Sequence, residues 1–541
     1  MLPRLALPPS RTVLALLALA FVAPGLAGHD PWKAFDATTI EVVRQMHLTG
    51  DWLVPRIAGE PWLEDPPFYY WTALACGTLF GWLLPFHDAA RLASGLYMLA
   101  ALWFVYLAAR HAAPPGAARA ERRAAGASAA LLLAGSLGLI VHAHEAVPDL
   151  AALAAACAAF AFAARAAAKP LRSGAAFGAA LGVAFLSTGV VVPAVLLAAA
   201  AGAAFASRAV RPLAFLAPAT AVGLLVAASW PLALALRAPD AAAAWWAIAG
   251  QARGEFAASL RYFIVTASWF AWPAWPLAAW AAWALRREWR APRVCLPLAG
   301  ALLALPGIAL AGPPQDINTI ALLAPLALLG AQGVARLRRG AANALDWFGV
   351  TAFGFFAGLV WLGYAAMMTG SPPRIANNFA KSAPGFTPQF ELLPFAVALA
   401  LTLAWLYVAF FTAPSPMRSV LRWTAGVALL WGTFATLWLP WADHQKGYRA
   451  VALQLKLRTP AGAGCVARVG LGAPQRAALS YHASIRTQPF NPARPDACRL
   501  ILVQGSPRHE GDAPGPGWQK LADVGRPNDK AERYRLYQRA P

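Results

Sequence analysis

The sequence predicts an all-α polytopic membrane protein of about 13 transmembrane helices, followed by a small C-terminal α/β domain outside the membrane. Of the 541 residues, 59% are hydrophobic and only 13% are charged, whereas about 25% of the residues of a soluble globular protein are charged. Apolar runs long enough to cross a bilayer recur from Leu14 to Leu439. After Trp441 the chain becomes polar. We therefore expect residues 1–441 to form the membrane domain and residues 442–541 to form a separate domain.

Positive charge is concentrated in short loops between the apolar runs. The formal net charge is +21, a value that would also suit a protein that binds nucleic acid. Lys and Arg in short loops, however, set the orientation of a membrane protein, because such loops stay in the cytoplasm. No nucleic-acid partner is therefore expected. The basic loops lie at 110–123, 165–173, 207–212, 286–293, 336–340 and 418–422.

The N-terminal segment has Arg4 and Arg11 ahead of the apolar run 12–28. This pattern is typical of a cleaved signal peptide and also of a first transmembrane helix. We favour the helix, since the apolar run is long and the chain that follows crosses the membrane many times. In both cases the residues after Gly28 are expected on the outer face of the membrane.

Placing every basic loop in the cytoplasm requires an even number of crossings between successive loops. This condition puts the N-terminus in the cytoplasm and the C-terminal domain outside. The expected spans are 12–28, 89–109, 132–147, 150–164, 174–188, 190–206, 213–236, 263–285, 294–311, 317–334, 347–368, 388–412 and 420–440.

The apolar stretch 66–86 is not expected to cross the membrane, because a crossing there would place the basic loop 110–123 outside. Its Tyr and Trp residues are typical of a segment that lies at the membrane interface. Residues 29–88 are therefore expected to form one outer-face segment, with the adjacent carboxylates of Glu64 and Asp65 at the membrane surface. Ionisable groups near hydrocarbon are costly, so this pair favours a functional role.

The same count of crossings brings other polar features to the outer face. They are Asp36, the HAHEAVPD segment at 142–149, the STG segment at 187–189 and the loop 237–262. Carboxylates and histidines from distant parts of the chain are thus expected to meet at one face, as an extracytoplasmic active site at the lipid boundary would require. A transporter would instead be expected to carry polar residues or helix breaks at mid-membrane.

Two short apolar runs in the C-terminal domain, 465–470 and 498–505, are typical of buried strands. Cys465 and Cys498 begin these runs and are the only cysteines outside the apolar region. In an oxidising compartment we expect a disulfide between them, the alternative being two free thiols. The chain has no CxxC, HExxH or Walker motif, so zinc, redox and nucleotide-hydrolysis functions have no local support.

The segment 36–71, DATTIEVVRQMHLTGDWLVPRIAGEPWLEDPPFYYW, resembles the first outer loop of the GT-C glycosyltransferases. It is most similar to the protein mannosyltransferase branch, which includes the lipid A aminoarabinose transferase. That family has an acidic pair, a helix ending in M-x-x-x-G-D-W, then P-x-x-x-G, and E-K-P-P before an aromatic run. The matching residues are Met46, Gly50, Asp51, Trp52, Pro55, Gly59, Glu64, Pro66, Pro67, Tyr69, Tyr70 and Trp71.

The sequence departs from the family pattern at one acid and at two cations. The first acid of the family's Asp-Glu pair is Phe35 here, so that only Asp36 is acidic. The lysine of E-K-P-P is Asp65. The Lys-Gly pair after the family's fifth helix, a contact for the donor phosphate, is replaced by a pair that begins with Thr188. Asp149, by contrast, fits the second acidic position that opens the family's fourth helix.

The resemblance implies a GT-C-like membrane glycosyltransferase that moves a sugar from a polyprenyl-phosphate donor to a lipid, glycan or protein acceptor. It implies a location in the bacterial inner membrane, with the C-terminal domain in the periplasm, and a role in the cell envelope such as lipid A modification. The leaving group is already a phosphate, so no cofactor is expected. Two alternatives stay open: a catalytically degenerate relative that only binds polyprenyl lipid, and a membrane transporter.

Asp36 is expected to be the general base that takes the proton of the acceptor hydroxyl, because of its place in the family loop. The residues around it allow another interpretation. Asp36 lies just before an expected helix at 39–48. Thr38 and Glu41 have the residue types and the spacing of a capping box at the start of that helix. In that interpretation Asp36 is a helix cap and takes no part in catalysis.

Other residues of the outer face are expected to bind the substrate. Glu64 would order the loop or contact the sugar, and Asp149 would lie at the site, although a turn or a helix start would also account for these acids. His142, His144 and Glu145 could bind a metal, but clusters at helix ends are usually solvated, so no metal is expected. The remaining candidates are the aromatic residues of the loop and cations that would hold the phosphate or anchor the chain at the interface: Tyr69, Tyr70, Lys33, Arg56, Arg253 and Arg261.

Overall fold

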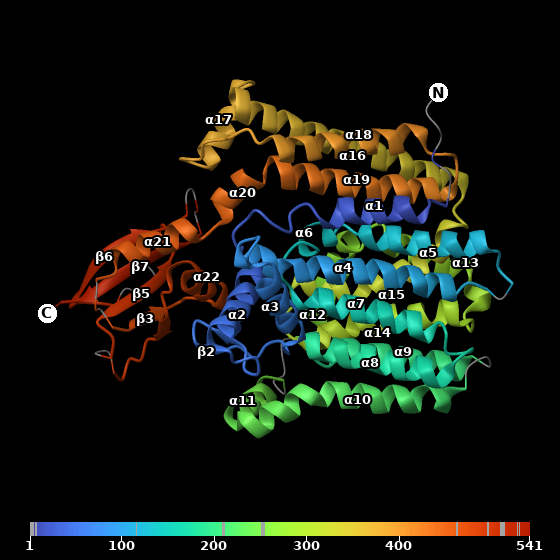
Figure 1. The fold of residues 1–541 in the computed structure, drawn as a ribbon, viewed down its shortest axis with the longest axis horizontal. Helices are drawn as coiled ribbons and strands as arrows, with labels where there is room; N and C mark the ends of the chain where they lie inside the picture. Colours follow the sequence, from blue (N-terminus) through green and yellow to red (C-terminus); the bar gives the residue numbers. More distant parts are fainter. Residues whose placement is uncertain are drawn as a thin grey trace.

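A computed structural model describes residues 5, 8–114, 116–207, 211–249, 255–460, 462, 464–494, 497–508, 514–526, 529 and 531–540. Most of these residues form a bundle of helices with nearly parallel axes, and a small α/β domain is attached to one end (Figure 1). We call this end of the bundle the domain end. The other end, where Leu5 pairs with Thr412 and where the basic loops connect the helices, is the basic end.

The bundle agrees with the predicted all-α membrane fold. In the described part of the chain, eight helical segments are long and apolar enough to cross a membrane, and α1, α7 and α9 are shorter apolar helices. In chain order, the helices of the bundle are α1 (Arg11–Val22), α4 (Phe86–His111), α5 (Arg119–Ala134), α7 (Pro148–Ala163), α8 (Pro170–Thr188), α9 (Val191–Ala206), α10 (Pro212–Arg237), α12 (Phe256–Phe270), α13 (Ala274–Ala284), α14 (Pro292–Ala311), α15 (Leu323–Val334), α16 (Arg339–Thr369), α18 (Leu392–Phe411) and α19 (Pro416–Leu437).

The other two expected spans are built differently from the prediction. The span expected at 132–147 begins earlier, with α5, because the Glu121 carboxylate accepts a hydrogen bond from the Ala118 N–H (3.1 Å) and caps the helix start. After Gly135 this span continues only as the short helix α6 (Leu139–His142). The span expected at 263–285 is divided into α12 and α13, because Pro273 has no N–H to continue the helix.

Segment 29–88 lies at the domain end and does not cross the bundle (Figure 1). It contains helix α2, a hairpin of two short strands and helix α3, which packs against α4. The turn of the hairpin has positive φ angles at Ala58 (53°) and Gly59 (90°), as two-residue hairpin turns require. The bounds are α2 (Phe35–Thr49), β1 (Arg56–Ile57), β2 (Glu60–Pro61) and α3 (Phe68–Phe80).

The capping box predicted for α2 is wrong. The helix begins at Phe35 instead of residue 39, so that Thr38 and Glu41 lie inside it, and no side chain caps its start. The Thr38 hydroxyl donates to the Phe35 carbonyl (2.8 Å). The start is displaced because Asp36 is fixed by partners outside the loop, which are described below.

The C-terminal domain has a five-stranded mixed sheet with the strand order β4-β3-β5-β7-β6. Strand β3 is parallel to β4 and β5, and β7 is antiparallel to β5 and β6. The runs expected to be strands at 465–470 and 498–505 are β3 and β5. The elements are α20 (Leu439–Lys446), α21 (Arg449–Arg458), β3 (Val466–Val469), α22 (Ala473–Ala483), β4 (Thr487–Pro489), β5 (Leu500–Gly505), β6 (Trp518–Val524) and β7 (Arg533–Arg539).

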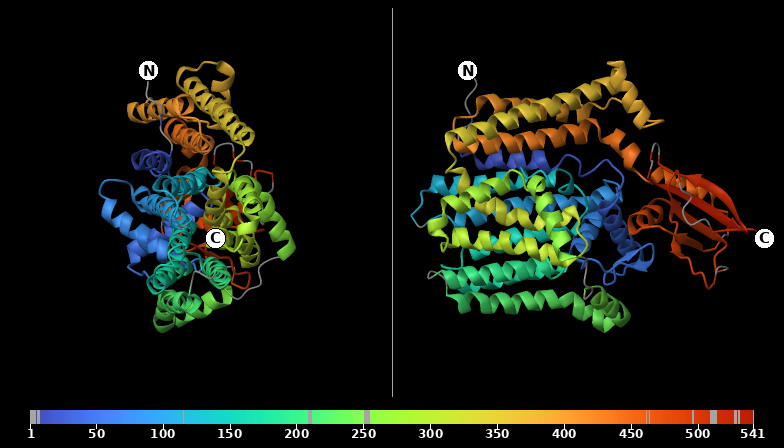
Figure 2. Two further views of the ribbon diagram at one scale, coloured as in Figure 1. Left: turned by 90° about the vertical axis from the view of Figure 1, so that its right-hand side faces the viewer. Right: turned by 180° about the vertical axis from the view of Figure 1, so that it is seen from behind.

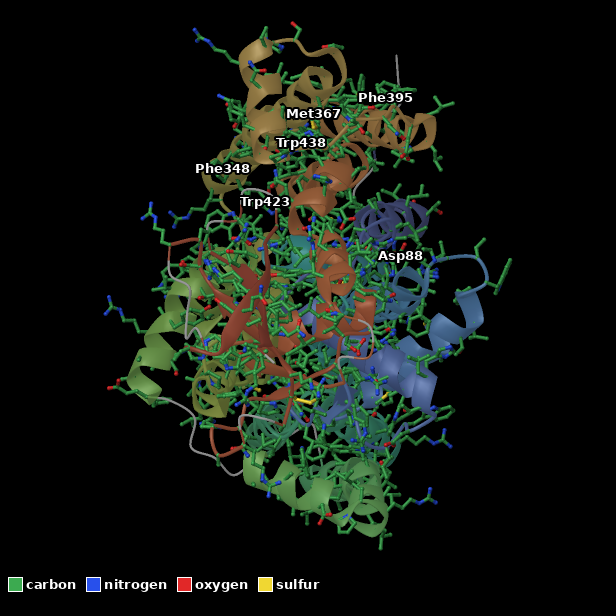
Figure 3. The ribbon with its side chains drawn as sticks, turned by 90° about the vertical axis from the view of Figure 1, so that its left-hand side faces the viewer. Asp88, Phe348, Met367, Phe395, Trp423 and Trp438 are labelled. Carbon is green, nitrogen blue, oxygen red and sulfur yellow. A yellow bond between two sulfur atoms is a disulfide. The ribbon has the colours of Figure 1, made fainter. Side chains whose placement is uncertain are left out.

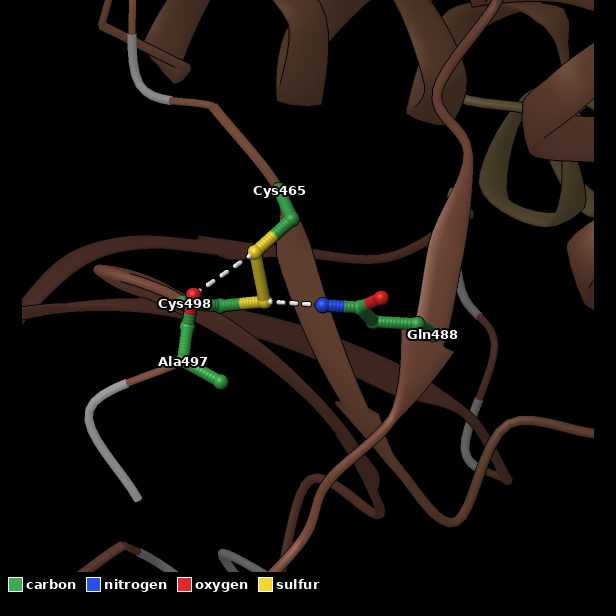
Figure 4. The surroundings of a disulfide bond; sticks show 4 residues. All are labelled: Cys465, Gln488, Ala497 and Cys498. Atoms are coloured by element: carbon green, nitrogen blue, oxygen red, sulfur yellow. Dashed lines mark hydrogen bonds between the residues drawn. A yellow bond between two sulfur atoms is a disulfide. The ribbon is translucent and has the colours of Figure 1, made fainter. Parts of the chain in front are cut away.

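The side chains of β5 alternate between the two faces of this sheet, as strand geometry dictates. Leu500 and Leu502 pack with α21 and α22, whereas Ile501 and Val503 pack on the opposite face. On that opposite face Cys465 and Cys498 form a disulfide with an S–S distance of 2.06 Å, and Gln488 donates to the Cys498 sulfur (Figure 4). The bridge joins the beginnings of the neighbouring strands β3 and β5.

Helices α16 and α18 form a layer outside α19, joined at the domain end by α17 (Pro373–Ser382) (Figures 1 and 2). Met367, Phe395 and Trp438 lie where α16, α18 and α19 meet (Figure 3). On the opposite side of the bundle, α10 is the outermost helix and continues into α11 (Pro239–Ala249). The outer helices expose much of their surface, as helices that face lipid do.

Candidate functional site

A cavity of about 390 Å³ lies at the domain end of the bundle. Three carboxylates line it, and no Lys or Arg of the described residues does; we therefore call it the acidic cavity. Ala473 and Pro474 at the start of α22 bring the C-terminal domain to its edge. The other segments that contribute to its walls are 34–39, 62–70, 147–149, 311–318 and Thr188.

The carboxylates of the acidic cavity are those of Glu64, Asp65 and Asp149. Glu64 and Asp65 lie just before two prolines, whose fixed φ angles turn the chain from the hairpin into α3. Asp149 follows Pro148 in the first turn of α7, where the helix dipole favours a negative charge. Among the described residues, no side chain donates a hydrogen bond to its carboxylate. The Asp149 carboxylate is therefore available to a ligand.

A narrow space of about 70 Å³, which we call the extension, adjoins the acidic cavity and lies between α7, α9 and α14. Asp149, Thr188 and Asn318 line both spaces, and the other side chains of the extension are aliphatic. The Thr188 hydroxyl oxygen is buried and has no hydrogen-bond partner among the described residues, although buried hydroxyls are normally bonded. A polar ligand atom at this junction would satisfy it.

Asp36 does not line the acidic cavity, because its side chain is fully buried between α2, α4 and the segment before α7. Its Oδ1 accepts hydrogen bonds from the Ala146 N–H (2.8 Å) and from Arg91 Nε (3.2 Å), and its Oδ2 accepts one from Arg91 Nη2 (2.9 Å). Arg91 also donates to Asp88 (2.7 Å), labelled in Figure 3. Burial raises the pKa of Asp36, but the Arg91 cation outweighs it, and the pKa lies below its usual value. Asp36 thus joins α2 to α4 and to the segment before α7.

All the positions at which the sequence departs from the family pattern do line the acidic cavity. They are Phe35, Asp65 and Thr188. Phe35, at the position of the family's first acid, contributes its ring, which meets His142 edge-on at 6.3 Å. The cavity therefore carries a phenyl ring, a carboxylate and a hydroxyl at the three positions where the resemblance implies an acid and two cations.

The two tyrosines of the loop have different positions. Tyr70 is buried at the wall of the acidic cavity, and burial raises its pKa well above the usual value, so that it is a neutral donor. Tyr69 is buried away from the cavity. Its hydroxyl lies 2.6 Å from Ser94 Oγ, which itself donates to the Glu145 carbonyl, so that Tyr69 is the donor to Ser94. Tyr69 therefore fixes α3 to α4.

None of the predicted cations lines the acidic cavity within the described residues. Lys33 forms an ion pair with Glu532 of the C-terminal domain. Arg56 lies 3.6 Å from Asp51, within the same loop, and Arg261 is exposed on α12. Arg253 lies outside the described residues. Lys33 and Arg56 thus hold protein carboxylates instead of facing the acidic cavity.

The histidines before α7 do not converge on one point. His142 Nδ1 lies 2.8 Å from Glu145, and its Nε2 lies 3.7 Å from Asp316. The nitrogens of His144 face the backbone carbonyls of Ile140 and Phe21 instead. In the part of the chain that the structure describes, no group of three or more His, Cys, Asp or Glu side chains is arranged to hold a metal ion.

The C-terminal domain is attached to the outer loop by charged side chains that the sequence analysis did not single out. Glu60 of the hairpin accepts hydrogen bonds from Arg468 (2.7 and 2.8 Å) and is paired with Arg476. Ser480 of α22 donates to Glu41 (2.6 Å). Partners such as Glu60 and Arg468 are separated by 408 positions, so that no local pattern indicates them.

The helical bundle, segment 29–88 with its hairpin and the attached α/β domain form a GT-C-like fold, which the chain shares with the solved structures of ArnT described next. The resemblance found in the sequence is thereby confirmed at the level of the fold. No family model matches the chain, and no curated protein matches its sequence.

The solved structures to which the chain is similar include ArnT from Cupriavidus metallidurans bound to undecaprenyl phosphate, with a TM-score of 0.68 and 18% sequence identity. The same enzyme in the apo state has a TM-score of 0.67 and 18% identity, and the alignments cover 97% of both chains. The archaeal oligosaccharyltransferase AglB from Archaeoglobus fulgidus matches with a TM-score of 0.45 and 12% identity, over 91% of this chain and 69% of its own. At 18% identity, the likeness to ArnT is one of fold.

Proposed function

We propose that this protein is a membrane glycosyltransferase that moves a hexosyl or pentosyl group from a polyprenyl-phosphate donor to a hydroxyl of a lipid, glycan or protein. The acidic cavity, which shares wall residues with the aliphatic extension between the helices, is the observation that carries this proposal. An amphiphile with a sugar head fits such a site, because its head would occupy the polar space and its chain the apolar one. The ArnT structure of the same fold holds undecaprenyl phosphate.

The acceptor must lose a proton as its oxygen attacks the anomeric carbon, and the leaving phosphate takes the electrons of the broken bond. We assign the proton acceptor to Asp149, since it lines the acidic cavity and has no cationic partner within hydrogen-bond distance among the described residues. The Thr188 hydroxyl and the Asn318 amide at the junction are positioned to donate to the phosphate. Glu64 and Tyr70 would contact the sugar from the opposite wall.

The orientation of the protein follows from its charges. The loops at the basic end carry most of the Lys and Arg of the membrane domain, so that we place this end in the cytoplasm and the acidic cavity in the periplasm of a bacterial inner membrane. A polyprenyl-linked sugar, an acceptor and the surrounding lipid are the partners in this arrangement.

A second function is favoured by one observation. No Lys or Arg lines the described walls of the acidic cavity, and cations are the usual means of stabilising a leaving phosphate. A protein that binds a polyprenyl lipid without turning it over would fit this composition.

Turnover by the purified protein in lipid nanodiscs distinguishes the two functions. Labelled polyprenyl-phosphate sugars would be offered together with extracted envelope lipids and glycans, and release of polyprenyl phosphate would be measured. The glycosyltransferase should release it, and Asp149→Asn should lower the rate by roughly 10²–10⁴-fold. Asp240→Asn, at an exposed position on α11, is the matched control and should keep the full rate. Donor binding without release by the wild type would favour the binding protein, and full activity of Asp149→Asn would remove Asp149 as the base.

A further inference from the structure

A second large cavity lies at the basic end, far from the acidic cavity. It is an apolar groove of about 630 Å³ between α13 and the first turns of α16, a size in the range of roughly 300–1,000 Å³ that is typical of ligand sites. Helix α13 packs on α15, and α16 packs on α19, so that this space between the two helix pairs is left open. We call it the α13–α16 groove. Its walls include Trp272, Leu277, Trp280, Ala344 and Phe348.

The inner end of the groove is aromatic. The Phe348 ring stacks on Trp423 with centroids 5.8 Å apart, and Trp272 meets Trp423 at 6.2 Å. Figure 3 labels Phe348 and Trp423, which lie side by side there. Ala341 and Ala344 of α16 line the groove and are exposed. These side chains present an apolar surface to which a hydrocarbon chain can pack.

Two side chains that line this apolar space carry a polar group without a partner among the described residues. Arg338 lines the groove where α16 begins, and no described carboxylate or carbonyl is bonded to it. The indole nitrogen of Trp280 is buried and has no hydrogen-bond acceptor among the described residues. Two other basic side chains of this end are engaged elsewhere: Arg336 donates to the Gln332 carbonyl, and Arg293 is paired with Glu288. Within the described part of the chain, the apolar wall of the groove is therefore lined by an arginine and a tryptophan N–H that lack partners.

We propose that the α13–α16 groove binds an anionic phospholipid, with an acyl chain between the helices, the phosphate at Arg338 and an ester oxygen at the Trp280 N–H. Charge decides the class of lipid, because an unpaired arginine at the membrane surface favours a head group with a net negative charge. The lipid would fill the space between the α13–α15 and α16–α19 pairs and so join them. This site does not depend on the proposed glycosyltransferase activity, since it lies at the other end of the bundle.

The test measures lipid binding to the purified, delipidated full-length protein by native mass spectrometry. Phosphatidylglycerol is the anionic probe and phosphatidylcholine the zwitterionic one. The wild type should retain phosphatidylglycerol in preference to phosphatidylcholine. Arg338→Gln should weaken phosphatidylglycerol binding about fivefold, the factor that corresponds to one arginine near an anionic head group. Arg287→Gln, at an exposed arginine of the same end and outside the groove, is the matched control and should bind as the wild type does.

Filling the groove tests the acyl chain separately. Ala344→Trp and the smaller change Ala341→Leu add apolar volume at exposed positions of α16, so that both should weaken binding of either lipid without unfolding the bundle. Equal retention of the two lipids by the wild type, an equal loss in Arg287→Gln, or unchanged binding in both filled variants would each overturn the proposal.

Discussion

Asp36 and Asp149 are both aspartates in the first turn of a helix at the domain end, yet their surroundings give them different chemistry. Asp36 is enclosed by Arg91 and by the Ala146 N–H, so that its carboxylate is paired and has no access to the acidic cavity. Asp149 lines that cavity and, among the residues that the structure describes, has no such partner. A paired and buried carboxylate stabilises the fold, whereas an unpaired one beside a cavity can accept a proton.

Replacing Asp36 by Asn should therefore reduce stability more than chemistry. The change removes the charge of one of the two carboxylate partners of Arg91, Asp88 being the other, and should cost up to about 3 kcal/mol, the lower end of the cost of breaking a buried ion pair. We expect a lower melting temperature in nanodiscs, with turnover per folded molecule retained. Asp51→Asn, which alters the half-exposed pair with Arg56 in the same loop, should cost no more than about 1 kcal/mol. A stable Asp36→Asn protein with turnover reduced by orders of magnitude would restore Asp36 as the general base.

The sequence predicted some of the elements around the site correctly and others wrongly. The strands β3 and β5 were expected from short apolar runs, since burial on both faces of a sheet leaves a continuous apolar signature. The start of α2 was misplaced, because a capping-box pattern at Thr38 and Glu41 is local, whereas Asp36 is held by a residue 55 positions away. The division of α12 from α13 was missed although Pro273 marks it, since the apolar run continues through the break.

The disulfide between β3 and β5 should stabilise the C-terminal domain by a measurable amount. Closing a loop with a sequence separation of 33 restricts the unfolded chain and should contribute about 3–4 kcal/mol to the stability of the C-terminal domain. Peptide mapping without reductant should find Cys465 linked to Cys498, and Cys465→Ser should lower the melting temperature. Alkylation of both cysteines in the unreduced protein would show that the bridge is not formed.

At the scale of the whole molecule, the distribution of charge predicts the orientation. Leu5 and the start of α1 lie at the basic end, and β7 lies in the C-terminal domain at the other end (Figure 1). A reporter enzyme fused after the last residue should therefore be active in the periplasm, and one inserted at 112–120 should be active in the cytoplasm. A cytoplasmic C-terminal fusion would place the acidic cavity inside the cell, where the proposed donor and acceptor would not meet it.

The sequence by itself determined the membrane class of the protein, most of its helices, the outer segment that does not cross the bundle and the strands that begin with Cys465 and Cys498. These features follow from local hydrophobic runs and from the charge of the loops, which act over a few residues or one loop at a time. Only the tertiary structure decided which carboxylates reach the acidic cavity. That outcome depends on pairings such as Asp36 with Arg91 and Glu60 with Arg468, across 55 and 408 positions. A charged side chain is paired or free according to which distant element packs against it, and no periodicity along the chain carries that information.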